Sequence, residues 1–206
     1  MLTEVGDKRV LFLMAAEAEY GPCLRALFKP VMTGVGPVEA AVVATATLAE
    51  LERKGALPEL VVSLGSAGSA RLEQCQVYQA NALAYRDMDA APLGFEKGVT
   101  PFLDLPARVT LPAVIPDLPS ASLSTGANIV SGVAYQGIAE DMVDMESFAI
   151  WRACQRFDRS LLVLRGISDG AAPLEGLHSW TEYLDIIDGR LAAAVQKLQL
   201  HLQSVA

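Results

Sequence analysis

The segment 161–170, which reads LLVLRGISDG, constrains the fold more than any other part of the sequence. Its first four residues form an apolar run that is typical of a strand buried on both faces of a sheet. A cation, a hydroxyl and a carboxylate then follow at Arg165, Ser168 and Asp169. Because ligands of open α/β sheets bind at the carboxyl ends of the strands, this pattern indicates a binding site. Ser, Asp and Gly also form ordinary turns, and this segment alone does not decide between the two interpretations.

Three other apolar runs end in similar groups. Glu17 and Glu19 follow the first run, Ser66 follows a later one, and Glu146 follows another. The carboxyl ends of parallel strands meet at one edge of a sheet, so we expect these groups and Asp169 to converge on one cleft. Each of the glutamates also has an ordinary interpretation, because carboxylates stabilise the N-terminus of a helix.

Alternating apolar runs and helical patterns predict an α/β fold. We expect strands at 9–14, 60–64, 77–85, 107–111 and 121–124. We expect helices at 20–28, 38–54, 147–157 and from 180 to about 203. The glycine-rich stretch 65–68 is interpreted as a turn whose backbone N–H groups can hold an anion or a sugar hydroxyl. The Gly-Val-Gly at 34–36 lacks the rest of a dinucleotide-binding fingerprint.

The composition bounds the class of protein. The chain has 206 residues, of which 52% are hydrophobic and only 19% charged, so residues 1–206 are predicted to form a single domain with a large core. A formal net charge of −8 argues against a nucleic-acid partner and against a basic membrane-binding patch. No apolar run is long enough to span a membrane.

The cysteines and histidines indicate neither disulfides nor a metal site. The three cysteines, Cys23, Cys75 and Cys154, are scattered, which is typical of free thiols in a reducing compartment. We therefore expect a cytoplasmic protein. His178 and His201 are far from any group of residues that could complete a metal site, so we expect no metal.

Five stretches together resemble the nucleosidases that cleave methylthioadenosine and adenosylhomocysteine, within the nucleoside phosphorylase superfamily. They occur in the family's order and read MAAEAEY (14–20), TGVGPVEAA (33–41), LGSAG (64–68), VDMESFAIWRAC (143–154) and VLRGISD (163–169). The resemblance implies a single-domain, three-layer α/β/α fold with a central twisted, mixed and largely parallel sheet. It also implies hydrolysis of a 5′-substituted adenosine with release of adenine, no metal or organic cofactor, and a homodimer.

The resemblance assigns the catalytic groups by position. Glu19 matches the general base that activates the attacking water, and Glu17 is the alternative if the alignment shifts by two residues. Asp169 matches the general acid that protonates the purine. Ser168 matches the residue that holds this carboxyl group, and Arg165 lies nearby in the motif.

Four further positions match residues that surround the sugar in the family. Glu146 matches the carboxylate that accepts both ribose hydroxyls, and Met145 matches a residue that lines the ribose. Ser66 matches a residue near the water and the sugar. Val35 matches an apolar contact to the sugar or to its 5′ substituent.

At the base, Ile129 and Val130 match positions that stack on the purine and read it through the backbone, and Trp180 matches an aromatic residue that closes over it. Two departures concern specificity. Ile129 is aliphatic where the family usually has an aromatic residue, and the region 102–124 is shorter than expected. The shortening also affects the surface through which the family forms its dimer.

The residues leave three functions open. N-glycosidic hydrolysis needs a proton for the leaving base and an acceptor for the water, and separated carboxyl groups supply both. A phosphorylase would need cations around its anionic nucleophile, but the stretch 64–68 has none and only Arg71 and Arg86 lie nearby in sequence, which favours water. The alternatives are a phosphorylase or a hydrolase of another nucleoside, and a catalytically silent nucleoside-binding relative.

Overall fold

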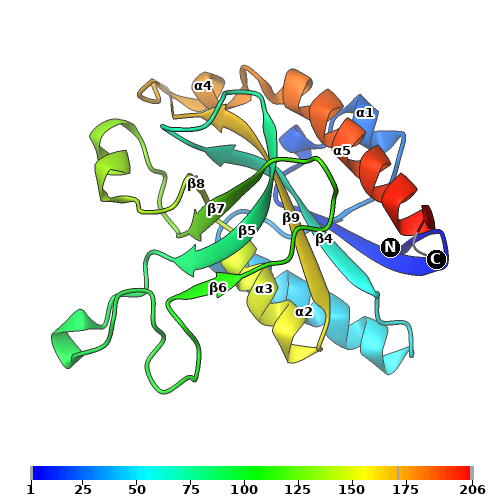
Figure 1. Ribbon diagram of the computed structural model, residues 1–206, viewed down its shortest axis with the longest axis horizontal. Helices are drawn as coiled ribbons and strands as arrows, with labels where there is room; N and C mark the ends of the chain where they lie inside the picture. Colours follow the sequence, from blue (N-terminus) through cyan, green and yellow to red (C-terminus); the bar gives the residue numbers. More distant parts are fainter. Residues whose placement is uncertain (1, 171, 205–206) are drawn as a thin grey trace.

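The computed structural model describes residues 2–170 and 172–204. Nine strands in these residues form one mixed sheet, with helices packed against it (Figure 1). The strands are β1 (Leu2–Val5), β2 (Lys8–Met14), β3 (Val31–Met32), β4 (Leu60–Gly68), β5 (Val77–Tyr85), β6 (Arg108–Thr110), β7 (Ser120–Thr125), β8 (Met142–Asp144) and β9 (Ser160–Asp169). The helices are α1 (Pro22–Arg25), α2 (Pro37–Arg53), α3 (Ser147–Arg156), α4 (Leu177–Thr181) and α5 (Leu184–Ser204), with short 3-10 turns η1 (Glu17–Glu19), η2 (Ala91–Leu93) and η3 (Gly132–Gly137).

The sheet closes on itself. β4 pairs in parallel with β9, β9 pairs antiparallel with β5, and β5 continues in parallel through β7 to β8. The ring is completed where Gly68 at the end of β4 pairs with Val143 of β8. The predicted α/β class and mixed sheet are confirmed, but the expected open layer is replaced by a closed barrel with β1, β2, β3 and β6 attached outside the ring.

Closure follows from the length of β4 and β9. β4 has nine residues and β9 has ten, so each strand has room for different neighbours at its two ends. β4 pairs with β2 over Leu60 to Leu64 and reaches β8 only at Gly68. A bulge between Ala67 and Gly68 changes the register at this point, and bulges increase the local bend and twist of a strand.

Two apolar clusters fill the two sides of the sheet. Alternate residues of β2 point to opposite sides, so Leu11 and Leu13 belong to the cluster with α2 and α3, whereas Phe12 belongs to the cluster with α5. This explains why the apolar run of β2 is continuous. Both faces of this strand are covered, as expected for strands of a parallel sheet.

The helical predictions are confirmed in part. The helices predicted at 38–54 and 147–157 are α2 and α3. The predicted helix 20–28 is reduced to the single turn of α1, and the last helix is divided into α4 and α5. Among the described residues, no helix is long and apolar enough to cross a membrane.

The predicted turn at 65–68 is wrong, because these residues continue β4. The glycines of this segment do not form a turn; they leave room for side chains of other elements to lie close to β4. A Cβ atom on Gly65 would lie 3.0 Å from both carboxylate oxygens of Glu19, and one on Gly68 would overlap the hydroxyl of Tyr135. Glycine in a strand often marks such a contact, so side chains from other elements occupy the space beside β4.

Candidate active site

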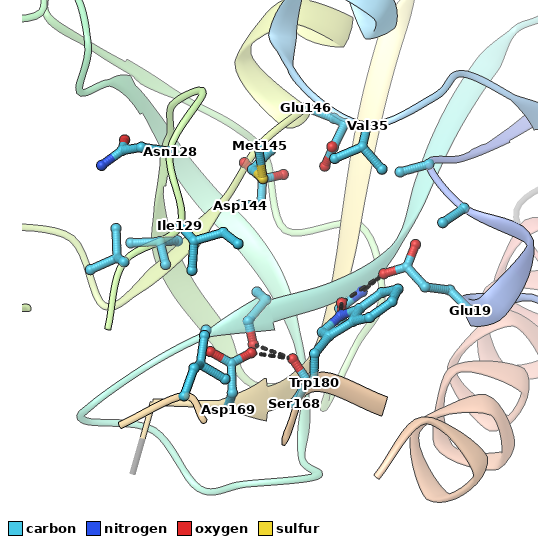
Figure 2. A pocket seen from close by; sticks show the side chains of 18 of the residues that line it. Glu19, Val35, Asn128, Ile129, Asp144, Met145, Glu146, Ser168, Asp169 and Trp180 are labelled. Carbon is cyan, nitrogen blue, oxygen red and sulfur yellow. Dashed lines mark hydrogen bonds between the residues drawn. The ribbon is translucent and has the colours of Figure 1, made fainter. Parts of the chain in front are cut away.

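A pocket of about 240 Å³ opens where β4, β8 and β9 end (Figure 2). Ten of the twelve residues singled out from the sequence line it: Glu19, Val35, Ser66, Ile129, Val130, Met145, Glu146, Ser168, Asp169 and Trp180. The polar groups expected at four strand ends are therefore brought together. Their convergence depends on the parallel pairing of β4 with β9, which aligns the ends of these two strands.

Glu19 is held at the pocket by Ser66. The 3-10 turn η1 follows β2 and places the Glu19 side chain against β4, where it is 7% exposed. The Ser66 backbone N–H and hydroxyl both donate to Glu19 Oε1, each at 2.7 Å. Glu19 Oε2 is buried and has no hydrogen-bond partner among the described residues. Burial raises the pKa of Glu19, and the two bonds from Ser66 oppose this rise.

Glu17 points away from this arrangement. Its Oε2 accepts a hydrogen bond from Arg25 Nη2 at 3.1 Å, and both side chains are exposed. The structure therefore distinguishes between the two glutamates, because only Glu19 lines the pocket.

Asp169 stands at the end of β9 beside Ser168 (Figure 2). The Ser168 hydroxyl donates to Asp169 Oδ1 at 2.6 Å. Burial raises the pKa of Asp169, while the bond from Ser168 acts in the opposite direction. Asp169 thus has one side-chain donor to stabilise its charge, whereas Glu19 has both a side-chain and a backbone donor. The environment favours the protonated form of Asp169.

Glu146 precedes α3 and turns its carboxyl group toward the pocket. Its Oε1 accepts the backbone N–H of Gly36 at 2.9 Å. Gly36 has a φ of 98°, a conformation that glycine adopts without strain, and this turn directs the N–H at Glu146. Burial, together with the neighbouring Asp144, raises the pKa of Glu146 to about 7.

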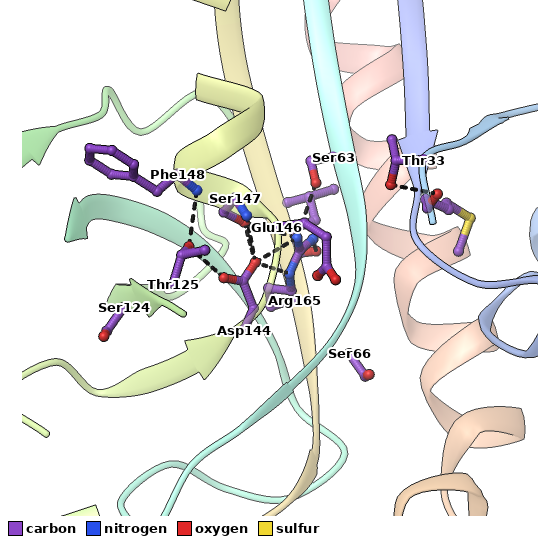
Figure 3. A network of polar contacts seen from close by, with 12 residues as sticks. Thr33, Ser63, Ser66, Ser124, Thr125, Asp144, Glu146, Ser147, Phe148 and Arg165 are labelled. Atoms are coloured by element: carbon purple, nitrogen blue, oxygen red, sulfur yellow. Dashed lines mark hydrogen bonds and ion pairs between the residues drawn. The ribbon is translucent and has the colours of Figure 1, made fainter. Parts of the chain in front are cut away.

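Arg165 lies behind the pocket rather than beside Asp169, which corrects the expectation from the sequence. Its side chain is 2% exposed and forms an ion pair with Asp144, with Nη2 2.9 Å from Oδ2 (Figure 3). Arg165 Nη2 also donates to the hydroxyls of Ser63 and Ser147. The positive charge of Arg165 lowers the pKa of both Glu19 and Glu146, so it acts on the site through electrostatics.

Asp144 is a site residue to which sequence reasoning gave no role. It accepts the Thr125 hydroxyl at 2.6 Å and the Ser147 backbone N–H at 3.0 Å, in addition to Arg165. These contacts fix the junction between β8 and α3, where Met145 and Glu146 lie. The only signal in the sequence was its position two residues before Glu146.

Arg86 was also missed as a lining residue. Its guanidinium donates to four backbone carbonyls, at Ser124, Asp144, Gly126 and Asn128. These bonds tie the ends of β7 and β8 to the loop that carries Ile129 and Val130. Because Arg86 is half-buried, desolvation lowers its pKa. The sequence gave no signal that this cation would bind carbonyls of the chain itself.

The loop at 128–130 forms one wall of the pocket (Figure 2). Val130 is buried, whereas Ile129 is 71% exposed. Asn128 lines the same wall and had no predicted role. Tyr135 lies nearby, with its hydroxyl against Gly68 and without a hydrogen-bond partner in the described chain. Burial and the negative charge of Asp169 raise the pKa of Tyr135.

Within residues 2–170 and 172–204, no group of three or more His, Cys, Asp or Glu side chains is arranged to hold a metal ion. The carboxyl groups of the pocket are instead separated, and each has its own partners. Figure 2 shows Glu19, Glu146 and Asp169 on different sides of the same cavity. Such a pocket can hold a neutral polar molecule between an acceptor and a proton donor.

No family model matches the chain. Among curated relatives, the 5′-methylthioadenosine/S-adenosylhomocysteine nucleosidase of Haemophilus influenzae is 28% identical, covering 81% of this chain and 78% of the relative. The protein of that name from Colwellia psychrerythraea is 29% identical over 84% of this chain and 76% of the relative. The chain is similar in sequence to methylthioadenosine/adenosylhomocysteine nucleosidases over most of its length.

Solved structures show that it shares their fold. The Colwellia psychrerythraea nucleosidase in complex with adenine matches with a TM-score of 0.78 and 21% identity, over 94% of this chain and 95% of that one. A futalosine hydrolase of Helicobacter pylori matches with a TM-score of 0.76 and 18% identity, over 92% of this chain and 96% of that one. The family resemblance expected from the five motifs is confirmed.

We predict that Asp144→Ala lowers the free energy of unfolding by about 3–5 kcal/mol, because it leaves the buried charge of Arg165 without its partner. Urea unfolding followed by circular dichroism measures the change. The matched control is Glu50→Ala, which removes an exposed pair with Lys54 and should leave the midpoint unchanged. Equal midpoints for the two variants would show that the Arg165–Asp144 pair has no structural importance.

Proposed function

We propose that this protein hydrolyses the N-glycosidic bond of a 5′-substituted adenosine, methylthioadenosine or S-adenosylhomocysteine or both, and releases adenine. The observation that carries the proposal is a pocket in which the carboxyl groups of Glu19, Glu146 and Asp169 lie in three different environments. The names of the curated relatives and of the adenine-bound structural neighbour support the substrate class.

Asp169 is the general acid in this proposal. The leaving purine needs a proton as its bond to the sugar breaks, and a carboxyl group that is protonated near neutral pH supplies it. Burial favours that protonated form, and the Ser168 hydroxyl fixes Oδ1 so that Oδ2 is left to carry the proton. Ser168 is therefore a positioning residue for the acid.

Glu19 is the general base. It must be ionised to accept a proton from the attacking water, and the two donors from Ser66 and the charge of Arg165 favour that state. Both donors bind Oε1 and so fix the orientation of the carboxyl group, while Oε2 has no hydrogen-bond partner among the described residues. The proposal thus assigns opposite protonation states to two carboxyl groups at one pH, as acid–base catalysis requires, although burial raises the pKa of both.

The sugar lies between these groups in the proposed complex. Glu146 accepts its hydroxyls, and Met145 and Val35 contact the ring and the 5′ substituent. Positive charge develops on the sugar as the bond breaks, so hydroxyl contacts to a carboxylate can strengthen in the transition state. The purine of the substrate lies against Ile129, Val130 and Trp180, which form the apolar part of the pocket wall.

Water is favoured over phosphate as the nucleophile. Arg86 is the one Lys or Arg side chain that lines the pocket in the described residues, and its Nη1 and Nη2 atoms donate to four backbone carbonyls. Arg71, the other basic residue near this region in the sequence, is bound to the carbonyls of 138–140. An anionic nucleophile would find no free cation at the Ser66 end of this described pocket.

We also propose that residues 1–206 act as one nucleosidase-like domain and that two copies form a homodimer beside the pocket mouth. Val35, just before α2, and Val38 and Val42, near the start of α2, are 55%, 70% and 59% exposed. Val35 also lines the pocket, so a second copy covering these valines would lie next to the site. The cytoplasmic location stays a prediction, which rests on the three scattered cysteines of the sequence.

We predict that Asp169→Asn lowers kcat for adenine release by about 10²–10⁴-fold, because the amide cannot protonate the purine. The assay measures adenine from methylthioadenosine and S-adenosylhomocysteine, with and without phosphate, and circular dichroism checks that the fold is retained. Asp158→Asn, at a fully exposed side chain, is the matched control and should retain activity.

The same assay separates the alternatives. Release by the wild type without phosphate supports the hydrolase, and release only with phosphate would make the protein a phosphorylase. No release would overturn the proposed substrate, and a binding screen that includes other nucleosides and futalosine would then distinguish another hydrolase from a silent binder. Normal turnover by Asp169→Asn would remove Asp169 from the mechanism.

We predict that KM rises as the pH falls below about 7. The pKa of Glu146 is raised to about 7, so below that pH its carboxyl group is protonated and loses an acceptor oxygen for the ribose. KM measured across this pH range should become nearly independent of pH in Glu146→Gln. Glu52→Gln, at an exposed position of α2, is the control. A wild-type KM that does not change through pH 7 would contradict the assignment.

A further inference from the structure

We propose that Trp180 is a positioning residue for Glu19 and acts through the hydroxyl of Ser66. The indole Nε1–H of Trp180 donates to Ser66 Oγ at 2.8 Å, and Ser66 Oγ donates to Glu19 Oε1 at 2.7 Å (Figure 2). The proposal rests on the proposed function, since it takes Glu19 as the base. It gives Trp180 a polar role in addition to the apolar contact with the substrate.

The direction of the Ser66 hydroxyl is the first step of the argument. A serine hydroxyl has one proton, and an indole N–H is a donor only. Since Trp180 donates to Ser66 Oγ, the hydroxyl proton is free to point at Glu19. Trp180 therefore selects the orientation in which Ser66 stabilises the carboxylate form.

The two oxygens of Glu19 are the second step. Oε1 receives the Ser66 hydroxyl and the Ser66 backbone N–H, while Oε2 is buried and unpartnered in the described residues. Ser66 therefore supplies every hydrogen bond that the described residues give this carboxyl group. A Ser66 hydroxyl without its Trp180 partner is free to rotate away, and Glu19 then loses one of the two contacts that hold its carboxyl group in place.

The place of Trp180 in the fold is the third step. It belongs to α4, a short helix between β9 and α5 that packs against β9. Its ring is partly buried against the apolar cluster that includes residues of α5, whereas Leu177 and His178 of the same helix are exposed. Trp180 thus connects α4 both to the apolar core and, through Ser66, to the general base Glu19.

The other charged groups around Glu19 do not depend on Trp180. Arg165 of β9 faces it and lowers its pKa, and Glu146 at the start of α3 is close enough for the two carboxylates to repel. From α5, which packs against η1, the buried Asp188 is engaged by the backbone N–H groups of Cys23 and Leu24. A change in the pKa of Glu19 on removing the indole N–H therefore reports the Ser66 link.

The kinetic test is Trp180→Phe, which keeps an aromatic ring but removes the donor. The acid limb of the pH profile of kcat/KM should move to higher pH by about 0.5–1 pH unit, because the carboxylate form of Glu19 loses a stabilising hydrogen bond. Activity should fall about 3- to 10-fold below that limb and stay near the wild-type value above it. Leu177→Ala, at an exposed position of α4, is the control and should follow the wild-type profile.

A second measurement does not need turnover. The chain has two tryptophans, so the ¹H–¹⁵N spectrum contains two indole signals, which Trp180→Phe assigns. Ser66→Ala should shift the Trp180 signal and leave that of the core residue Trp151 in place. In the wild type, the Trp180 signal should also titrate with pH, and Glu19→Gln should abolish this titration.

The two readouts keep the proposals separate. If the wild type releases no adenine, the proposed function fails, but the indole spectra still test the link from Trp180 to Glu19. An unshifted Trp180 signal in Ser66→Ala would overturn the link. An unchanged pH profile in Trp180→Phe, with the wild type active, would overturn the positioning role. A uniform rise of KM at every pH would reduce Trp180 to a substrate contact.

Discussion

The ion pair between Arg165 and Asp144 is the interaction on which the site depends. It joins the middle of β9 to the junction of β8 with α3, and Arg165 Nη2 reaches Ser63 of β4 as well. Both side chains are almost completely buried, so neither charge is stable there without the other. The pair therefore holds together the three strands whose ends form the pocket. It also places a positive charge behind Glu19 and Glu146.

Around this pair, similar carboxyl groups acquire different properties from their local partners. Glu19 has two donors from Ser66, Asp169 has the Ser168 hydroxyl, and Glu146 has the backbone N–H of Gly36. Burial raises the pKa of all three, and the local hydrogen bonds, the charge of Arg165 near Glu19 and Glu146, and the charge of Asp144 near Glu146 make their environments different. The proposed chemistry needs such differences, because one carboxyl group must give a proton while another accepts one.

The predicted polar residues of this pocket could be read from the sequence because polar groups at the ends of buried strands form a pattern. The resemblance to the nucleosidases alone indicated its other predicted lining residues, which are Val35, Ile129, Val130, Met145 and Trp180. Sequence reasoning failed where the meaning of a residue depended on distant contacts. Gly65 and Gly68 indicated a turn, but they are small because Glu19 and Tyr135 lie against β4. The position of Arg165 in the chain predicted a place near Asp169, yet its side chain pairs with Asp144. The closure of the sheet was equally invisible, since it depends on one contact between Gly68 and Val143.

The central claim is that Asp169 is protonated at a pH at which Glu19 is ionised. Isotope-edited infrared difference spectra of the wild type against Asp169→Asn and Glu19→Gln measure this directly, at the pH of maximal adenine release. The account predicts that Asp169→Asn removes the signal of a protonated carboxyl group and that Glu19→Gln removes that of an ionised carboxylate. The reverse assignment, or two groups in the same state, would contradict it.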